Sequence, residues 1–96
     1  MSETDRKICK LEIANRRGLH ARASAKFVKC IGQFDAQVMV SKDGVEVDGQ
    51  SIMGLLMLGA NLGSSIEVTA EGAEADQALE AVTELVEAKF YEDQET

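Results

Sequence analysis

The chain has few of the features that mark secreted or membrane-spanning proteins. Two cysteines in 96 residues are too few for a disulfide framework or a zinc site. No apolar run approaches the roughly 18 residues that a membrane-spanning helix needs, and the amino-terminal segment MSETDRK lacks the apolar centre of a signal peptide. The sequence therefore predicts a cytoplasmic protein in which Cys9 and Cys30 are buried thiols.

Positive charge and aromatic side chains are also scarce. Ten basic residues face 17 acidic ones, which gives a net charge of −7, and the aromatic residues are three Phe and one Tyr. General nucleic-acid binding needs a basic surface, and binding to single strands relies on aromatic stacking. Composition therefore disfavours nucleic acid as a ligand, although a small-molecule- or RNA-binding α/β module remains an alternative hypothesis.

The positive charge that is present lies at one end of the chain. Eight of the ten basic residues fall between positions 6 and 29, and the only acidic residue in that segment is Glu12. The last thirty residues instead hold ten acids against Lys89. Such a basic end indicates an acidic partner or an anionic group bound there, and the alternative is a solvated surface without a role.

Length and an apolar content of 45% predict one domain over 1–96, with a core from about 8 to 90 and frayed ends at 1–6 and 91–96. Alternation of apolar and polar residues predicts four strands. These are the segments ICKLEIAN (8–15), DAQVMVS (35–41), VEVD (45–48) and IEVTAEG (66–72). The pair Asp43–Gly44 is a hairpin turn signal between the second and third strands.

Apolar residues at helical spacing predict three helices. The first runs from Ala21 to a stop at Gly32, and the second, within GQSIMGLLMLG, has Ser51 as its N-cap and Gly59 as its stop. The third has one apolar stripe, made of Ala75, Ala78, Leu79, Val82, Leu85, Val86 and Phe90. The order β-α-β-β-α-β-α predicts a two-layer α+β sandwich, in which three helices cover one face of a mainly antiparallel sheet.

The chain's single histidine, His20, comes immediately before the first predicted helix. Free backbone N–H groups at a helix N-terminus bind anions. Arg22 adds a fixed positive charge suited to phosphate, and Gly18 permits a bend just before the histidine. Because imidazole is a competent nucleophile near neutral pH, His20 could accept a phosphoryl group, and the alternative is a surface or capping histidine. No Asp, His and Cys cluster suggests a metal, and no cofactor is expected.

The second predicted helix is apolar nearly all round. A short helix on a sheet buries only about half of its circumference, so some of its Met and Leu side chains should form a docking surface, unless the helix is fully buried. Ser51 could also carry a phosphate, which a helix N-terminus tolerates, or act as a plain N-cap.

The segment GLHARASAKFV, followed by SIMGLLMLG, resembles the histidine-containing phosphocarrier protein (HPr) family of the bacterial phosphotransferase system. The resemblance covers about residues 8–90. It implies an open-faced β-sandwich with strand order 1-4-2-3. It also implies that His20 takes a phosphoryl group on Nδ1 from enzyme I and passes it to an enzyme IIA protein, as a monomeric carrier rather than a turnover enzyme.

The resemblance assigns roles to further residues. The backbone of Ala21 and Arg22, with the Arg22 side chain, would stabilise the phosphate. Ser51 matches the serine that HPr kinase/phosphorylase modifies in some lineages. The partner-docking positions are Ile52, Met53 and Leu56.

The sequence departs from the family pattern at one position, and it leaves the pathway open. Ala23 stands where the family usually has proline, and because alanine is a good helix former we expect the site to survive. The sequence is also similar to the nitrogen-related regulatory branch, so sugar uptake and control of nitrogen or carbon metabolism both remain open. A regulator that works only by binding partners, with Ser51 as its switch, is the rival hypothesis.

Overall fold

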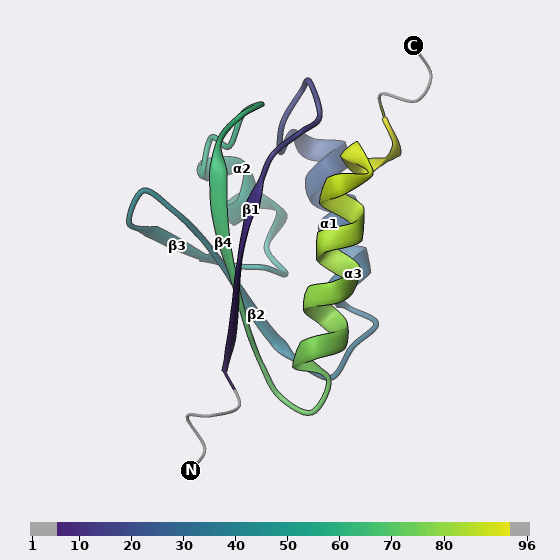
Figure 1. Ribbon diagram of the computed structural model, residues 1–96. Coiled ribbons are helices and arrows are strands. Elements are labelled where there is room, and N and C mark those ends of the chain that lie inside the picture. The colour runs from purple at the N-terminus through teal and green to yellow at the C-terminus, as the bar shows by residue number, and fades with distance from the viewer. Residues whose placement is uncertain (1–5, 93–96) are drawn as a thin grey trace.

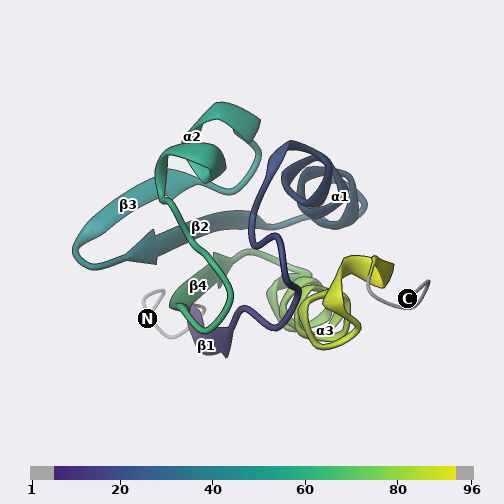
Figure 2. The same ribbon diagram turned by 90° about the horizontal axis from the view of Figure 1, so that it is seen from above.

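The computed structural model describes residues 6–92, which form a four-stranded antiparallel sheet with three α-helices on one face (Figures 1 and 2). The elements follow the predicted order, with one short additional turn at the end. Their bounds are β1 Lys7–Glu12, α1 Ala21–Ile31, β2 Gln37–Lys42, β3 Val45–Asp48, α2 Ile52–Met57, β4 Ser65–Glu71, α3 Ala75–Glu87 and η2 Lys89–Tyr91. The predicted α+β fold class is confirmed.

The sheet has the strand order β1-β4-β2-β3, and all neighbouring strands are antiparallel. Val68 of β4 pairs with Cys9 of β1 on one side and with Val40 of β2 on the other. Val68 is fully buried, whereas the adjacent Glu67 is exposed. This alternation follows from the two-residue period of a strand, and it buries only the face that the helices cover.

The helices form one layer in which α1 lies between α2 and α3 (Figure 2). Helix α3 also packs on β1 and β4, and α2 packs on β3. The core fills the space between this layer and the sheet. Its largest fully buried side chains include Phe27, Phe90, Ile13, Ile31, Leu55 and Ile66.

The turn residues adopt conformations that explain most of the predicted element ends. Asp43 and Gly44 both have positive φ, 52° and 85°, as a two-residue type I′ hairpin turn requires. Gly59 has a φ of 63° and follows the last residues of α2, in agreement with its predicted role as a left-handed stop. Gly32 follows α1 with a φ of −65°, so that helix ends without a left-handed glycine.

The carboxyl-terminal end differs from the helix that the apolar stripe predicts. Helix α3 ends at Glu87, and the backbone then makes a left-handed turn in which Lys89, Phe90 and Tyr91 have φ values of 59°, 54° and 59°. Phe90 is fully buried as expected, but this turn buries it rather than a continued helix. Glu92, expected to lie in a frayed tail, follows the turn and contacts the core of the candidate site; residues 93–96 lie outside the described residues.

Candidate functional site

The loop before α1 is held against the segment that follows α2. Gly18 has a φ of 67°, and a Cβ atom built on it would lie 2.4 Å from the backbone oxygen of Ala60. The next residue, Leu19, donates its N–H to that same oxygen at 2.9 Å. Only glycine fits such a close approach in this conformation, so the predicted bend at Gly18 fixes the position of the residue that follows Leu19.

That residue, His20, is the N-cap of α1. Its backbone is extended, with φ −77° and ψ −177°, and its Nδ1 atom accepts the N–H of Arg22 at 3.3 Å. Its carbonyl oxygen accepts the N–H of Ser24, which begins the helical hydrogen bonding. The imidazole therefore sits at the positive end of the helix dipole, with Nδ1 directed toward the first turn.

The other ring nitrogen of His20 contacts a residue from the opposite end of the chain. His20 Nε2 is hydrogen-bonded to Glu92 Oε2. The second carboxylate oxygen of Glu92, Oε1, accepts a hydrogen bond from Asn15 Nδ2 at 3.0 Å, and the same amide nitrogen donates to the carbonyl oxygen of Gly18 at 2.9 Å. Since Nδ1 accepts an N–H and Nε2 faces a carboxylate, the geometry is that of a neutral imidazole with its proton on Nε2.

Burial holds this group of side chains in place. Asn15 is fully buried, the His20 side chain is 17% exposed and the Glu92 side chain is 11% exposed. Lys26 of α1 donates from Nζ to the Phe90 carbonyl oxygen at 2.6 Å and so ties the left-handed turn to the helix. The start of α1 and the end of α3 lie at the same end of the molecule (Figure 1).

Sequence reasoning did not identify Asn15 and Glu92 as members of the site. Asn15 falls at the end of a strand pattern, where a polar residue is ordinary, and Glu92 lies among the ten acids of the carboxyl-terminal third. The one signal that could have indicated the contact is Phe90, an apolar residue that follows the helix by three positions and needs a packed turn to bury it.

The remaining site residues of the sequence analysis fall into two groups. Ala21 and Arg22 form the first turn of α1, and both are exposed. Ser51 is the N-cap of α2, and its Oγ atom accepts the N–H of Gly54 at 2.9 Å. The predicted cap is therefore present, and its hydroxyl lies at a partly exposed position.

Helix α2 buries one side and exposes the other. Leu55 and Leu58 are buried, whereas Ile52 is 39% exposed and Met53 is 68% exposed. The exposed apolar side chains, which we call the α2 surface, are Ile52, Met53, Leu56 and Met57. Leu62, in the loop after the helix, is exposed as well and was not singled out from the sequence.

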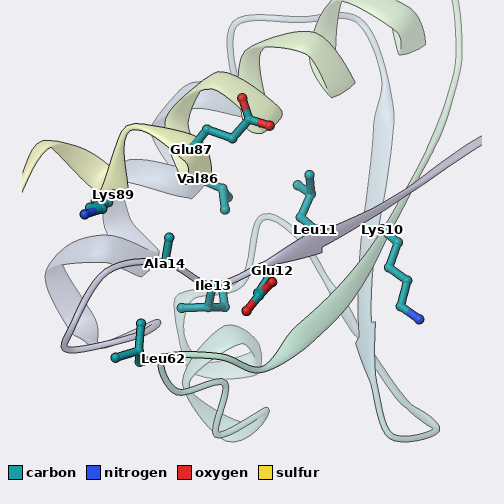
Figure 3. A pocket seen from close by; sticks show the side chains of 9 residues that line it. All are labelled: Lys10, Leu11, Glu12, Ile13, Ala14, Leu62, Val86, Glu87 and Lys89. Carbon is teal, nitrogen blue, oxygen red and sulfur yellow. The ribbon is translucent and has the colours of Figure 1, made fainter.

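A groove on another part of the molecule runs between β1 and the end of α3 (Figure 3). Ala14 and Val86 direct their side chains toward its centre, and Glu87 lies at its rim (Figure 3). Its lining includes none of the predicted site residues. The groove therefore carries no part of the candidate chemistry around His20.

Other chemistries have little support within residues 6–92. No three or more His, Cys, Asp and Glu side chains of this part of the chain gather in a way that could hold a metal ion. None of its helices is long and apolar enough to cross a membrane. Cys9 and Cys30 are free and only partly buried, so the expectation of two buried thiols is met in part. Burial, and then the negative charge of Glu84, raise the pKa of the Cys30 thiol above its ordinary value of 9.0, which makes it a poor nucleophile near neutral pH.

Comparison with known proteins agrees with the fold and identifies the family. Residues 8–88 match the family described as the PTS HPr component phosphorylation site. The phosphocarrier protein HPr of Neisseria meningitidis serogroup B is 46% identical over 82 residues, which cover 85% of this chain and 92% of that protein. The phosphocarrier protein NPr of Shewanella violacea is 40% identical over 80 residues, which cover 83% and 88%.

Solved structures show the same likeness. A crystal structure of HPr from Thermoanaerobacter tengcongensis superposes with a TM-score of 0.87 at 40% identity, covering 91% of this chain and 98% of that one. A structure described as an HPr dimer from the same organism superposes with a TM-score of 0.71 at 41% identity, covering 83% and 92%. The chain belongs to the HPr family, the phosphocarrier proteins of the phosphotransferase system.

Proposed function

We propose that His20 is the residue that carries the phosphoryl group, on its Nδ1 atom. The observation that supports this proposal most directly is the bond from the Arg22 N–H to Nδ1 at the start of α1. A phosphoryl group on Nδ1 takes over that position, so its oxygens become the acceptors for the first-turn N–H groups of Ala21 and Arg22. The helix end that now caps the imidazole then stabilises the phosphate.

The Arg22 side chain supplies the second part of the phosphate site. It is exposed in the first turn of α1, one residue beyond the start of the helix. A guanidinium presents several donors in a fixed plane and stays charged, which suits it to a phosphate oxygen pair. Ala23, the next residue, is fully buried, and an alanine in the first turn keeps the helix intact without the proline that is usual in the family.

The protein acts as a carrier in this proposal, not as an enzyme that turns over a metabolite. Enzyme I donates the phosphoryl group, and an enzyme IIA protein, of sugar or nitrogen type, accepts it. The proposal also takes the protein to be a monomer in the cytoplasm. Both partners must reach His20, and the α2 surface supplies exposed Met, Ile and Leu side chains for a transient apolar contact. The Ala60–Leu19 bond ties the segment that follows α2 to the residue before His20.

Ser51 is the proposed site of regulation by an HPr kinase/phosphorylase. Its hydroxyl is at the N-terminus of α2, and Ile52 and Met53 follow directly with exposed side chains. A dianionic phosphate on Ser51 is tolerated by the helix end, but it places charge at the edge of an apolar docking surface. Phosphorylation at Ser51 therefore weakens docking of enzyme I without unfolding the helix.

The proposal is tested by phosphorylation with enzyme I and labelled phosphoenolpyruvate. The wild-type protein and the Ser51→Ala variant should both take up acid-labile label, as phosphohistidine does, and His20→Ala should take up none. Equal labelling of His20→Ala would refute the assignment. Label that is entirely acid-stable would instead favour the regulator that acts through Ser51.

A further inference from the structure

The contact between His20 and Glu92 joins the reacting ring to a carboxylate that the proposed phosphate site does not need. Glu92 reaches the ring because the left-handed turn after α3 folds back over the start of α1. Its two carboxylate oxygens have different partners, His20 Nε2 and Asn15 Nδ2. Because Asn15 also bonds to the Gly18 carbonyl oxygen, the carboxylate is fixed to the same loop that places His20.

We propose that Glu92 is a positioning residue for phosphoryl transfer, which holds the proton of His20 on Nε2 and leaves the Nδ1 lone pair free to attack phosphorus. This inference rests on the proposed function of His20. Which imidazole nitrogen carries the proton is set by the hydrogen bond that the other nitrogen makes. Here the Arg22 N–H at Nδ1 and the Glu92 carboxylate at Nε2 both favour the same tautomer.

The balance of the transfer step shows what the carboxylate contributes. The Nδ1 lone pair forms the bond to phosphorus, and the electron pair of the broken bond leaves with the donor. The Nε2 proton stays where it is, so the ring acquires a positive charge next to the Glu92 carboxylate. On onward transfer the N–P bond breaks, the pair returns to Nδ1, and no proton enters or leaves. A fixed carboxylate that orients an imidazole and stabilises its charged form serves other histidine-dependent reactions in the same way.

A purely structural role for Glu92, as an anchor for the end of the chain, is the competing explanation. Phe90 is already fully buried and its carbonyl oxygen is bonded to Lys26, so the turn has other anchors. Glu92→Ala should therefore leave the fold in place. Glu92→Gln keeps the size of the side chain and an amide oxygen that can accept from Nε2, but it removes the charge. Glu87→Ala is the matched control, because Glu87 is an exposed acid at the end of α3 whose side chain lies at the rim of the groove on the β1 side.

The test combines proton NMR of the unphosphorylated protein with rates of phosphoryl acceptance from enzyme I. In wild type and Glu87→Ala the His20 Nε2 proton should be protected from exchange and give a resolved ¹⁵N-coupled signal, which Glu92→Ala should lose. Loss of one charge-assisted hydrogen bond predicts that Glu92→Ala accepts the phosphoryl group about tenfold more slowly, with Glu92→Gln in between. Circular dichroism confirms that each variant is folded.

Two outcomes would overturn the inference. One is a Glu92→Ala variant that accepts phosphate as fast as wild type or faster, since a faster variant means that the contact inhibits transfer. The other is a wild-type Nε2 proton that exchanges as freely as in Glu92→Ala. Failure of the proposed function looks different, because wild type itself would then take no label at His20 whatever the NMR signal shows.

Discussion

Asn15 and Glu92 meet across nearly the whole length of the chain, with Asn15 Nδ2 donating to Glu92 Oε1 at 3.0 Å. The same amide nitrogen donates to the Gly18 carbonyl oxygen, so one buried side chain links the loop before α1 to the end of the described chain. His20 follows the loop that Asn15 holds, and its Nε2 atom contacts Glu92. The geometry of the candidate site therefore depends on the folding of the carboxyl-terminal turn as well as on α1.

We expect Asn15→Ala to lower the free energy of unfolding by about 1–2 kcal/mol, the usual net loss for two hydrogen bonds to a buried amide. The Oδ1 atom of Asn15 is buried without a partner among the described residues, and the variant relieves that cost, which keeps the expected loss near the lower value. Urea unfolding measures the difference. Asn61→Ala, at an exposed position, is the control and should change stability by less than about 0.5 kcal/mol. Equal effects of the two variants would contradict this prediction.

Gly18 and Gly59 form a matched pair that separates backbone strain from close packing. Their φ values are 67° and 63°, but a Cβ on Gly18 would meet the Ala60 oxygen, whereas a Cβ on Gly59 would meet no atom of the described chain within 4 Å. Gly59→Ala should cost only the strain of a left-handed alanine, about 1 kcal/mol. Gly18→Ala should cost about 3 kcal/mol or more, because the loop must also move away from Ala60. Urea unfolding of the two variants gives the comparison, and similar losses would mean that the loop yields freely.

The features that depend only on neighbouring residues in the sequence could be predicted from it. The alternation of Val68 and Glu67 along β4, the cap at Ser51 and the position of His20 before α1 all follow from local patterns that one element determines by itself. The exposure of Met53 could be anticipated as well, because a two-turn helix on a sheet must leave apolar side chains outside.

The contact of Glu92 with His20 could not be predicted in this way. It joins residues 72 positions apart and requires Lys89, Phe90 and Tyr91 to adopt positive φ, a conformation that such residues seldom take. No local pattern indicates it, because the burial of Phe90 and the bond from Lys26 to its carbonyl oxygen are what compensate for the strained turn. The close approach of Gly18 to Ala60 could not be predicted either, because it joins two segments that are far apart in the sequence, although Gly18 itself predicts a bend.

Replacement of Arg22 should slow phosphoryl transfer without destabilising the protein. Its side chain is exposed, so we expect Arg22→Ala to change the free energy of unfolding by less than about 0.5 kcal/mol. Loss of a charge-assisted contact to phosphate predicts a transfer rate about tenfold lower, and Arg22→Lys should recover only part of it because an ammonium lacks the planar donor pair. Rapid-quench labelling from enzyme I measures both rates. Lys29→Ala, which removes the same charge from the other end of α1, should transfer at the wild-type rate, and a similar loss there would point to a general charge effect.

The stability of the protein should depend on Cys30 at alkaline pH. Burial in the first place, and Glu84 in the second, raise the pKa of this thiol above 9.0, so the unfolded chain loses the proton at a lower pH than the folded protein. The unfolded state then binds fewer protons, and the contribution of the thiol to stability is complete below pH 9 and falls as pH rises through the folded-state pKa. Urea unfolding at several pH values should show the advantage of wild type over Cys30→Ala shrinking above pH 9. A difference that stays constant with pH would contradict the prediction.

Two substitutions at Ser51 should separate its capping role from its charge. Its Oγ atom accepts the Gly54 N–H, so Ser51→Ala removes the cap and should lower the free energy of unfolding by about 1 kcal/mol. Aspartate is itself a good N-cap, so Ser51→Asp should keep the stability of wild type while it places a negative charge beside Ile52 and Met53. Urea unfolding together with transfer rates from enzyme I should therefore give opposite results: a less stable Ser51→Ala that transfers normally, and a stable Ser51→Asp that transfers more slowly. A Ser51→Asp variant that transfers at the wild-type rate would argue against control of docking from this position.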